Sequence, residues 1–249
     1  MSFDKRNIEY LTYDILNEED KLLAYTFTRK GGVGENEFES LNLSNNVGDH
    51  PQSVNENRKI VQDFIKAKKL VFSNQVHQDD IIEITQANLE KLPSCDALVT
   101  KLKDIALVIT HADCQACLLY DRENQIIAAI HAGWKGLTKN IYAKTVNFLI
   151  DKGSKPENII VCISPSLKSC HSEFRNFKKE LPESFWSYEK EEKHFDLLQI
   201  AIDQLKDAKI LEKNIEVADI CTYCKEDEYF SYRRNNKTGR NATIIMLKN

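Results

Sequence analysis

The sequence lacks the marks of a membrane-spanning, secreted or nucleic-acid-binding protein. Its apolar runs fall well short of the roughly 20 residues that a bilayer-spanning helix needs. Residues 1–10 carry charges from Asp4 onward and have no apolar stretch followed by small residues, so they do not resemble a secretory signal. A formal charge of -4 gives no electrostatic basis for binding nucleic acid. We therefore expect a cytoplasmic protein with no nucleic-acid and no membrane partner.

Glycine-based nucleotide motifs are also absent. The eight glycines form neither a Gly-x-Gly-x-x-Gly pattern nor a P-loop, which removes the usual dinucleotide and nucleoside triphosphate interpretations. Internal repeats, low-complexity tracts and Pro/Gly/Ser linkers are missing as well. With 42% hydrophobic and 29% charged residues, the chain is predicted to form a single domain over residues 1–249 with a sizeable core.

Cysteine is present in an odd number, seven, which favours metal or thiol chemistry over a disulfide framework. Cys221 and Cys224 have Cys-x-x-Cys spacing, but this tail motif is a single pair and cannot by itself build a zinc ribbon, which needs two pairs. A redox pair would lack its usual βαβ setting. We expect these two residues to be buried, reduced thiols that pack near the functional site.

Short apolar runs bounded by polar residues predict buried strands, and longer segments with apolar residues three or four apart predict helices. Strands are expected at 22–29, 70–76, 105–110, 116–120, 126–131, 159–163, 215–220 and 242–247. Helices are expected at 53–69, 137–151 and around 198–205. The order does not alternate strictly, so the predicted fold class is α/β, with a mixed β-sheet covered by helices on both faces.

Three candidate metal ligands fall at strand ends or in the loops that follow them: His77, Cys114 and His131. Two imidazoles and one thiolate suit zinc, and three protein ligands leave the fourth tetrahedral position open, as in a catalytic site. The three residues are far apart in the sequence and match no compact zinc pattern. By spacing alone they could equally be ordinary buried polar residues.

Other residues near these positions are candidates for catalysis or binding. His111 and Asp113 could shuttle protons by adjacency, and Cys114 could alternatively act as the nucleophile of a thiol hydrolase. Arg29, Asn42 and Lys135 could bind phosphate, ribose or a base edge. A surface arginine and a turn asparagine are equally good interpretations of Arg29 and Asn42, and the alternative for the loop at Lys135 is a plain strand-to-helix turn with Trp134 in the core.

Several short motifs in a fixed order give the chain a family resemblance over nearly its whole length after about residue 22. They lie at 27–33, 40–43, 47–49, 55–58, 75–77, 96–100, 112–114, 131–134, 221–224, 230–234 and 238–240. On these motifs the chain resembles the laccase-domain proteins, known both as polyphenol oxidases and as purine nucleoside phosphorylases. Each motif is short, but their succession is specific.

The resemblance implies a single α/β domain whose metal site falls on His77, Cys114 and His131. It also implies phosphorolysis of adenosine, inosine and methylthioadenosine and deamination of adenosine, with purine nucleosides and phosphate as partners. The chain departs from the family at His111, where threonine is commoner, and at Lys135, where arginine is frequent. Segment 163–173 also departs from the usual pattern, which leaves the substrate preference open.

A copper-dependent polyphenol oxidase is the alternative enzyme, because a set of two histidines and one cysteine is also typical of blue-copper sites. A blue site together with a three-copper cluster requires many more imidazoles than the six histidines of this chain. Zinc is therefore the expected cofactor, with copper as the alternative.

Overall fold

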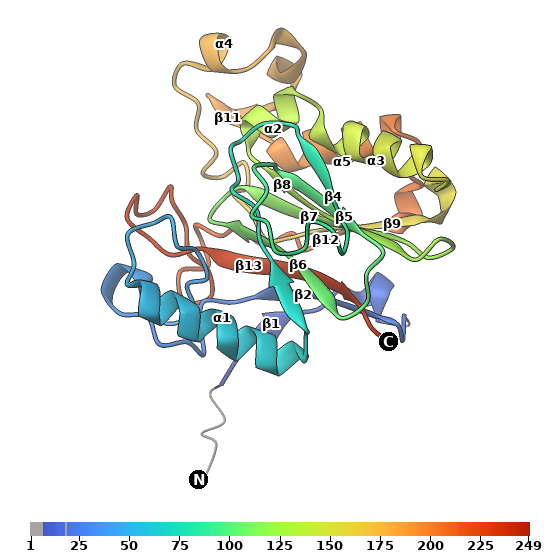
Figure 1. Ribbon diagram of the computed structural model, residues 1–249. Helices are drawn as coiled ribbons and strands as arrows, with labels where there is room; N and C mark the ends of the chain where they lie inside the picture. The colour runs from blue at the N-terminus through green and yellow to red at the C-terminus, as the bar shows by residue number, and fades with distance from the viewer. Residues whose placement is uncertain (1–6, 18) are drawn as a thin grey trace.

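Two mixed β-sheets stack on one another in the computed structural model, which describes residues 7–17 and 19–249 (Figure 1). Of the described residues, five strands form the first sheet, in the order β1 (Tyr10–Leu11), β2 (Leu22–Phe27), β13 (Asn241–Leu247), β6 (Ile105–His111) and β3 (Lys69–Val71). Only β3 and β6 are parallel neighbours in it. Strands from opposite ends of the chain, β2 and β13, therefore pair directly.

The second sheet holds the strand that carries the candidate ligand His131 and the strand that begins directly after Cys114. Its order is β12 (Ile215–Val217), β9 (Ile159–Ile163), β7 (Gln115–Asp121), β8 (Ile126–Ala132), β5 (Ala97–Thr100) and β4 (Ile81–Ile84). The pairs at both edges are parallel, and the central pairs are antiparallel. A short hairpin of β10 (Glu189–Glu191) and β11 (His194–Phe195) lies outside both sheets.

Helices cover the outer faces of this stack. On the first sheet lies α1 (Pro51–Ile65), and on the second lie α2 (Trp134–Thr138), α3 (Ile141–Asp151) and α5 (Leu197–Asp207), with the one-turn α4 (Phe177–Glu180) beyond them. Proline suits the first turn of α1, because that position needs no backbone N–H. The mixed α/β class is thus confirmed, and the helices flank both sides, but two stacked sheets replace the one expected.

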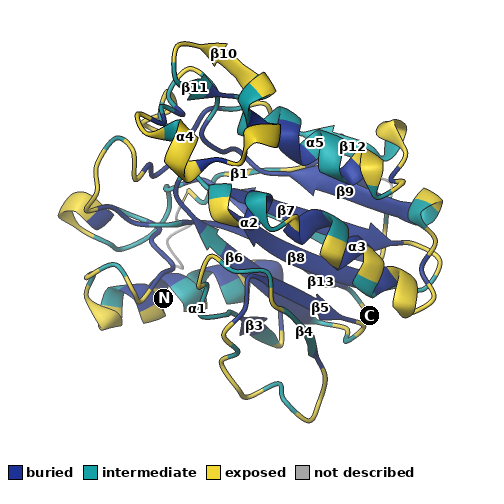
Figure 2. Cartoon of the chain, turned by 90° about the horizontal axis from the view of Figure 1, so that it is seen from above, coloured by how far each residue is buried: buried dark blue, intermediate teal, exposed yellow. Residues whose placement is uncertain are grey.

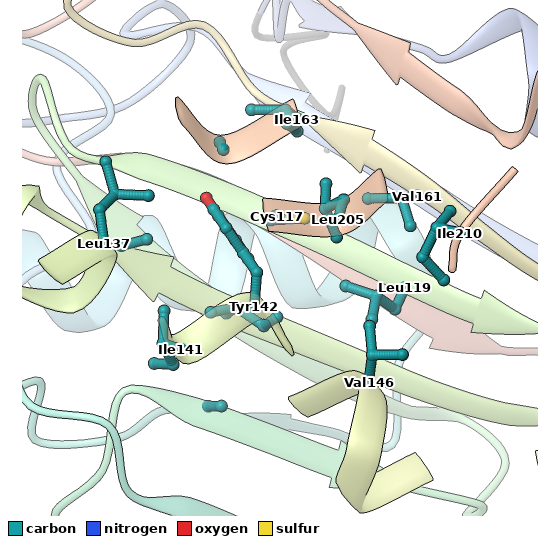
Figure 3. Close-up of a cluster of buried hydrophobic side chains, with 14 of the residues drawn as sticks. Cys117, Leu119, Leu137, Ile141, Tyr142, Val146, Val161, Ile163, Leu205 and Ile210 are labelled. Atoms are coloured by element: carbon teal, nitrogen blue, oxygen red, sulfur yellow. The ribbon is translucent and has the colours of Figure 1, made fainter. Parts of the chain in front are cut away.

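Alternating side chains of the central strands pack into different cores, which explains why their sequences are apolar throughout. On β7, Cys117 and Leu119 face α3 and α5 (Figure 3), whereas Leu118 and Tyr120 face the other sheet. The inner strands β5, β7, β8 and β9 are buried along their length, and yellow, exposed positions gather on the outer sides of the helices (Figure 2). A strand buried on both faces loses the polar alternation of a surface strand.

The helix expected at 137–151 is divided in two. Asn140 has φ +57°, a left-handed conformation that ends α2, and its side chain accepts a hydrogen bond from the Ala143 amide at the start of α3. Likewise α1 ends before Lys66, whose φ is +56°, so that Lys69 belongs to β3 rather than to the expected helix. Local backbone reversals therefore set boundaries that hydrophobic spacing did not reveal.

The described part of the chain, 7–17 and 19–249, includes no helix that is long and apolar enough to cross a membrane. Residues 1–6, on which the interpretation of the N-terminus partly depends, lie outside the described residues.

Candidate metal centre and cavity

The three residues predicted as metal ligands come together at one end of the second sheet. His77 lies in the loop between β3 and β4, Cys114 in the turn between β6 and β7, and His131 in β8. Their ligand atoms all lie within 4.8 Å of one another, and the two imidazole rings meet edge to face with centroids 4.9 Å apart. This set offers two nitrogens and one sulfur to a single ion and leaves a tetrahedral position open.

Asp96 orients two of these ligands. Its Oδ1 accepts a hydrogen bond from His131 Nδ1 at 2.8 Å, which leaves Nε2 of that ring as the nitrogen available to a metal. The same carboxylate accepts the backbone amides of Val76, His77 and Gln78 at 2.8 to 3.1 Å. These bonds hold His77 in a left-handed conformation, with φ +57°. One fully buried carboxylate thus links the β8 ligand to the loop ligand.

The electrostatics of the site favour a thiolate at Cys114. Burial by itself raises the pKa of this thiol, but the His131 and His77 imidazoles outweigh burial and bring the pKa down to about 6. Burial lowers the pKa of His131, whereas the Cys114 thiolate and the Asp96 carboxylate raise it to about 9. A thiolate is the form of cysteine that binds metals.

The backbone at Gly133 leaves space beside the ligands. A Cβ atom at this position would lie 2.9 Å from Cys114 Sγ and 3.3 Å from His77 Cδ2, both closer than ordinary contact. Any other residue at position 133 would press on two of the three ligands. The donor set and this space together fit a metal ion held by His77, Cys114 and His131.

The ligand set opens into a cavity of about 520 Å³. Its walls carry two arginines, Arg58 from α1 and Arg240 just before β13, and two aromatic rings, Phe72 and Tyr232. Arg58 donates through Nε to the Leu43 carbonyl at 2.9 Å, and its guanidinium lies 3.9 Å from the centroid of the Phe72 ring. The Arg240 guanidinium bonds to the Thr238 and Gly239 carbonyls. Both cations are fixed by protein contacts within the cavity that contains the ligands.

His111, one of the two proton-transfer candidates, does line this cavity. Its Nε2 lies 2.8 Å from Thr243 Oγ1. Thr243 Oγ1 is in turn hydrogen-bonded to Thr26 Oγ1, and Thr26 Oγ1 to the Tyr13 hydroxyl, which makes a chain of three buried hydrogen bonds. Burial, and then the positive charges of His131 and Arg240, lower the pKa of His111 to about 3. His111 is therefore a neutral imidazole at neutral pH.

Asp113, the other candidate, faces away from the cavity. Its carboxylate accepts the Thr222 hydroxyl at 2.7 Å and the Arg233 amide at 2.5 Å, and its φ is +87°. Its backbone carbonyl accepts the Leu167 amide at 2.9 Å. In this structure Asp113 connects the turn that carries Cys114 to two distant loops.

The three candidates for substrate binding lie outside the cavity wall. The Arg29 guanidinium stacks on Phe230 at 4.6 Å and donates to the Glu226 carbonyl, and Lys135 is exposed on α2 beside Trp134. Asn42 is fully buried and holds the Ser44 and Arg240 amides through its side-chain oxygen. Asn42 thus positions a cavity arginine without reaching the cavity itself.

Sequence reasoning missed the residues that complete the site. Asp96, Arg58 and Arg240 stood inside recognised motifs but received no role. A signal for Asp96 existed, since a carboxylate directly before the apolar run 97–99 needs partners once that strand is buried. The arginines gave no such signal, because only the folded chain brings α1 and β13 to the same cavity.

The match to a family model decides the family. Residues 23–248 match the model described as multi-copper polyphenol oxidoreductase laccase. The chain belongs to this laccase family. The expected family resemblance is thereby confirmed over almost the whole chain.

Curated relatives of this laccase-family chain carry a different name. The purine nucleoside phosphorylase of Corynebacterium glutamicum is 31% identical, with 94% of this chain and 98% of that protein covered. The purine nucleoside phosphorylase YfiH of Escherichia coli is 31% identical, with coverage of 90% and 93%. Both names describe enzymes, and both proteins align over nearly their full length.

Solved structures show the same fold. The hypothetical protein YfiH of Bacillus licheniformis has a TM-score of 0.86 and 31% identity, with 93% of this chain and 94% of that chain covered. YlmD of Geobacillus stearothermophilus has a TM-score of 0.87 at 24% identity, covering 100% and 98%. The fold of this chain is therefore shared with both of these proteins.

Proposed function

We propose that this protein is a zinc-dependent purine nucleoside phosphorylase that acts on adenosine, inosine and methylthioadenosine. The observation that carries the proposal is the meeting of the His77, Cys114 and His131 ligand atoms with two arginines in one cavity of about 520 Å³. The names of relatives about 30% identical to the chain support the same reaction class. A nucleoside and a phosphate are together small enough for a cavity of this size.

Zinc is the proposed metal, because a mixed nitrogen and sulfur donor set with an open position is typical of catalytic zinc sites. When bound, zinc supplies a Lewis acid that stabilises negative charge developing on the substrate. The thiolate of Cys114 and the orientation of His131 by Asp96 prepare the ligands for it. The reduced thiol that this requires favours the cytoplasm as the place of action.

In phosphorolysis a phosphate oxygen forms a bond to C1′ of the ribose while the bond from C1′ to the purine nitrogen breaks, and the base leaves. We assign the positioning of phosphate to Arg58 and Arg240, because planar guanidinium groups bind phosphate oxygens in pairs. We assign Phe72 and Tyr232 to the base, since aromatic rings stack on a flat purine. Phosphate and base would then lie on neighbouring parts of one wall.

Adenosine deamination is the second proposed reaction, in which water adds at C6 of the purine and ammonia leaves. It requires a group that moves protons close to the substrate. His111 lines the cavity as a neutral imidazole, in which one nitrogen can donate a proton and the other accept one. The Asp113 carboxylate, by contrast, already accepts hydrogen bonds from Thr222 and Arg233. We therefore assign proton transfer to His111 rather than Asp113.

Two other enzyme classes make different demands. A multi-copper oxidase needs ligands for several copper ions, and the six histidines of this chain are too few to supply them. A thiol hydrolase would use Cys114 as a nucleophile and would remain active without metal. The phosphorylase proposal instead requires both the metal and phosphate.

Product chromatography on purified, zinc-loaded protein tests the proposal. Adenosine and inosine should release free base only when phosphate is present, and adenosine should yield inosine without it. Because neither reaction uses oxygen, both should proceed at the same rate under anaerobic conditions. Chelation should stop both reactions and added zinc restore them. Oxygen-dependent turnover of phenols without release of base or ammonia would overturn the proposal in favour of the oxidase.

A further inference from the structure

A second group of metal-ligating side chains lies apart from the cavity. Cys170 and His171 come from the loop after β9, and Cys221 and Cys224 from the turns after β12. The four ligand atoms all lie within 4.8 Å of one another. Cys221 and Cys224 were expected to be two buried thiols near the functional site, but Cys224 is exposed and neither lines the cavity. They are joined instead by two residues about fifty positions earlier.

The distances within this group match those around one tetrahedral ion. Zinc binds sulfur at about 2.3 Å and nitrogen at about 2.0–2.1 Å, so tetrahedral angles place two sulfurs about 3.8 Å apart and a sulfur and a nitrogen about 3.6 Å apart. Cys170 Sγ lies 3.6 Å from Cys221 Sγ and 3.8 Å from Cys224 Sγ. His171 Nδ1 lies 3.2 Å from Cys170 Sγ and 3.5 Å from Cys224 Sγ.

We propose that Cys170, His171, Cys221 and Cys224 form a second, structural zinc site with three sulfur ligands and one nitrogen. The four ligands complete a tetrahedron and leave no position for a substrate, which separates this site from the open one at His77, Cys114 and His131. The proposal does not rest on the proposed enzyme activity.

The surroundings of the four ligands support a metal. The His171 ring stacks on Tyr223, with centroids 3.8 Å apart and planes 17° apart, which fixes the imidazole so that Nδ1 faces the sulfurs. The backbone amides of Lys168 and Cys224 hydrogen-bond to the Cys221 sulfur. Hydrogen bonds of this kind orient metal ligands and stabilise their charged form.

A disulfide explains this geometry less well than a metal. One disulfide joins two sulfurs at about 2.05 Å and does not explain why a third thiol and an imidazole lie beside them. Here Cys170 Sγ lies at nearly equal distances from two other sulfurs, and a histidine nitrogen completes the set. A single central ion accounts for all four side chains.

The position of the site gives the zinc a structural role. The Thr222 hydroxyl, between two of the ligands, donates to Asp113, and Arg233 donates to the Asp113 carboxylate through its amide and to the His171 carbonyl through its guanidinium. Asp113 precedes Cys114 in the chain. The second zinc would therefore fix the two loops that hold the turn carrying a ligand of the first.

Metal analysis of the full-length protein, purified with its thiols reduced, tests this proposal. Two tetrahedral sites predict about two zinc ions per chain in the wild type and about one in Cys114→Ser or in Cys224→Ser. The double variant should hold none, and His50→Ala, which changes an exposed histidine away from both groups, should keep two. The proposal would be overturned if Cys224→Ser still held two zinc ions. It would also be overturned if the wild type held a single zinc ion and Cys114→Ser held none.

Cobalt provides a second measurement that does not depend on activity. Cys114→Ser isolates the second site, and titration with Co²⁺ should give the intense sulfur-to-cobalt absorption expected for three thiolates. His171→Cys should retain this binding as a four-thiolate site, whereas His171→Ala should lose it, with circular dichroism used to check that each variant is folded. A mass two daltons below that of the reduced chain, with Cys170 and one partner resistant to alkylation and no cobalt bound, would assign a disulfide and overturn the proposal.

Discussion

Asp96 Oδ1 and His131 Nδ1 lie 2.8 Å apart, and this contact decides which nitrogen of the imidazole faces the other metal ligands. The same carboxylate holds the backbone of the 76–78 loop, so it acts on His77 as well. The shape of the candidate metal centre therefore depends on a residue that does not itself bind the metal.

Asp96→Asn should weaken zinc binding by roughly 10- to 100-fold, because the amide loses the charge that orients both histidines. Competition with a chromophoric chelator measures the affinity. Asp121→Asn is the matched control. Asp121 is also fully buried and accepts two backbone amides, but it lies at the end of β7 that is far from Cys114. Equal zinc affinity in Asp96→Asn and the wild type would show that the carboxylate does not orient the ligands.

Gly133→Ala should reduce zinc content at the first site while the protein remains folded. The new methyl group would lie 2.9 Å from Cys114 Sγ, so the ligand must move. Gly136→Ala, only three residues away, meets its nearest atom at an ordinary 3.5 Å and should keep the metal. Removing a helix glycine there should even raise stability, by up to about 1 kcal/mol. Metal analysis and thermal unfolding of both variants check this; normal zinc content in Gly133→Ala would contradict it.

Replacing either cavity arginine, Arg58 or Arg240, with alanine should raise the KM for phosphate in phosphorolysis by roughly tenfold or more, since a lost charge-assisted hydrogen bond is worth about 1.5–3 kcal/mol. Deamination uses no phosphate and should change less. Arg29→Ala is the control, because that guanidinium stacks on Phe230 outside the cavity wall. If the KM for phosphate rose only in Arg29→Ala, phosphate binding would be assigned to Arg29 instead of Arg58 and Arg240. Initial rates at varied phosphate concentration measure all three.

Thr243→Val should destabilise the fold by about 1–3 kcal/mol, because it leaves His111 Nε2 buried without its 2.8 Å partner. The two side chains have nearly the same shape, so packing changes little. Thr243→Ser keeps the hydroxyl and should lose less. Urea unfolding gives the free energies, and a Thr243→Val variant as stable as the wild type would show that the buried hydrogen-bond chain adds nothing.

Hydrophobic spacing predicted the elements whose burial is continuous. The strand at 159–163 has the expected bounds, and the strands at 105–111 and 126–132 differ by one residue. Strand β4, of mixed polarity, and the four-residue β5 were not predicted, because such short elements lack a repeating pattern. Spacing also could not separate one sheet from two, since both arrangements bury the same strands on both faces.

At the functional site, sequence reasoning located ligands better than it located the groups around them. His77, Cys114 and His131 have side chains whose chemistry suggests a metal wherever they lie in the chain. Arg29 and Lys135 were chosen because a cationic side chain can bind phosphate, and charge alone does not fix the direction in which a side chain points. Cys170 and His171 were not connected to the later cysteines, because the two loops meet only in the folded chain, where Ser166 and Cys221 form a parallel bridge.

The position of β13 also constrains how the protein is made. This strand, residues 241–247, pairs with β2 on one side and β6 on the other, so the first sheet cannot be completed before these residues have left the ribosome. Domains whose strands pair with segments distant in the sequence fold slowly, and their unpaired strand edges are prone to aggregation until those segments are available. Arg240 directly precedes β13, so a nascent chain acquires its complete cavity only after residues 240–247 have been made.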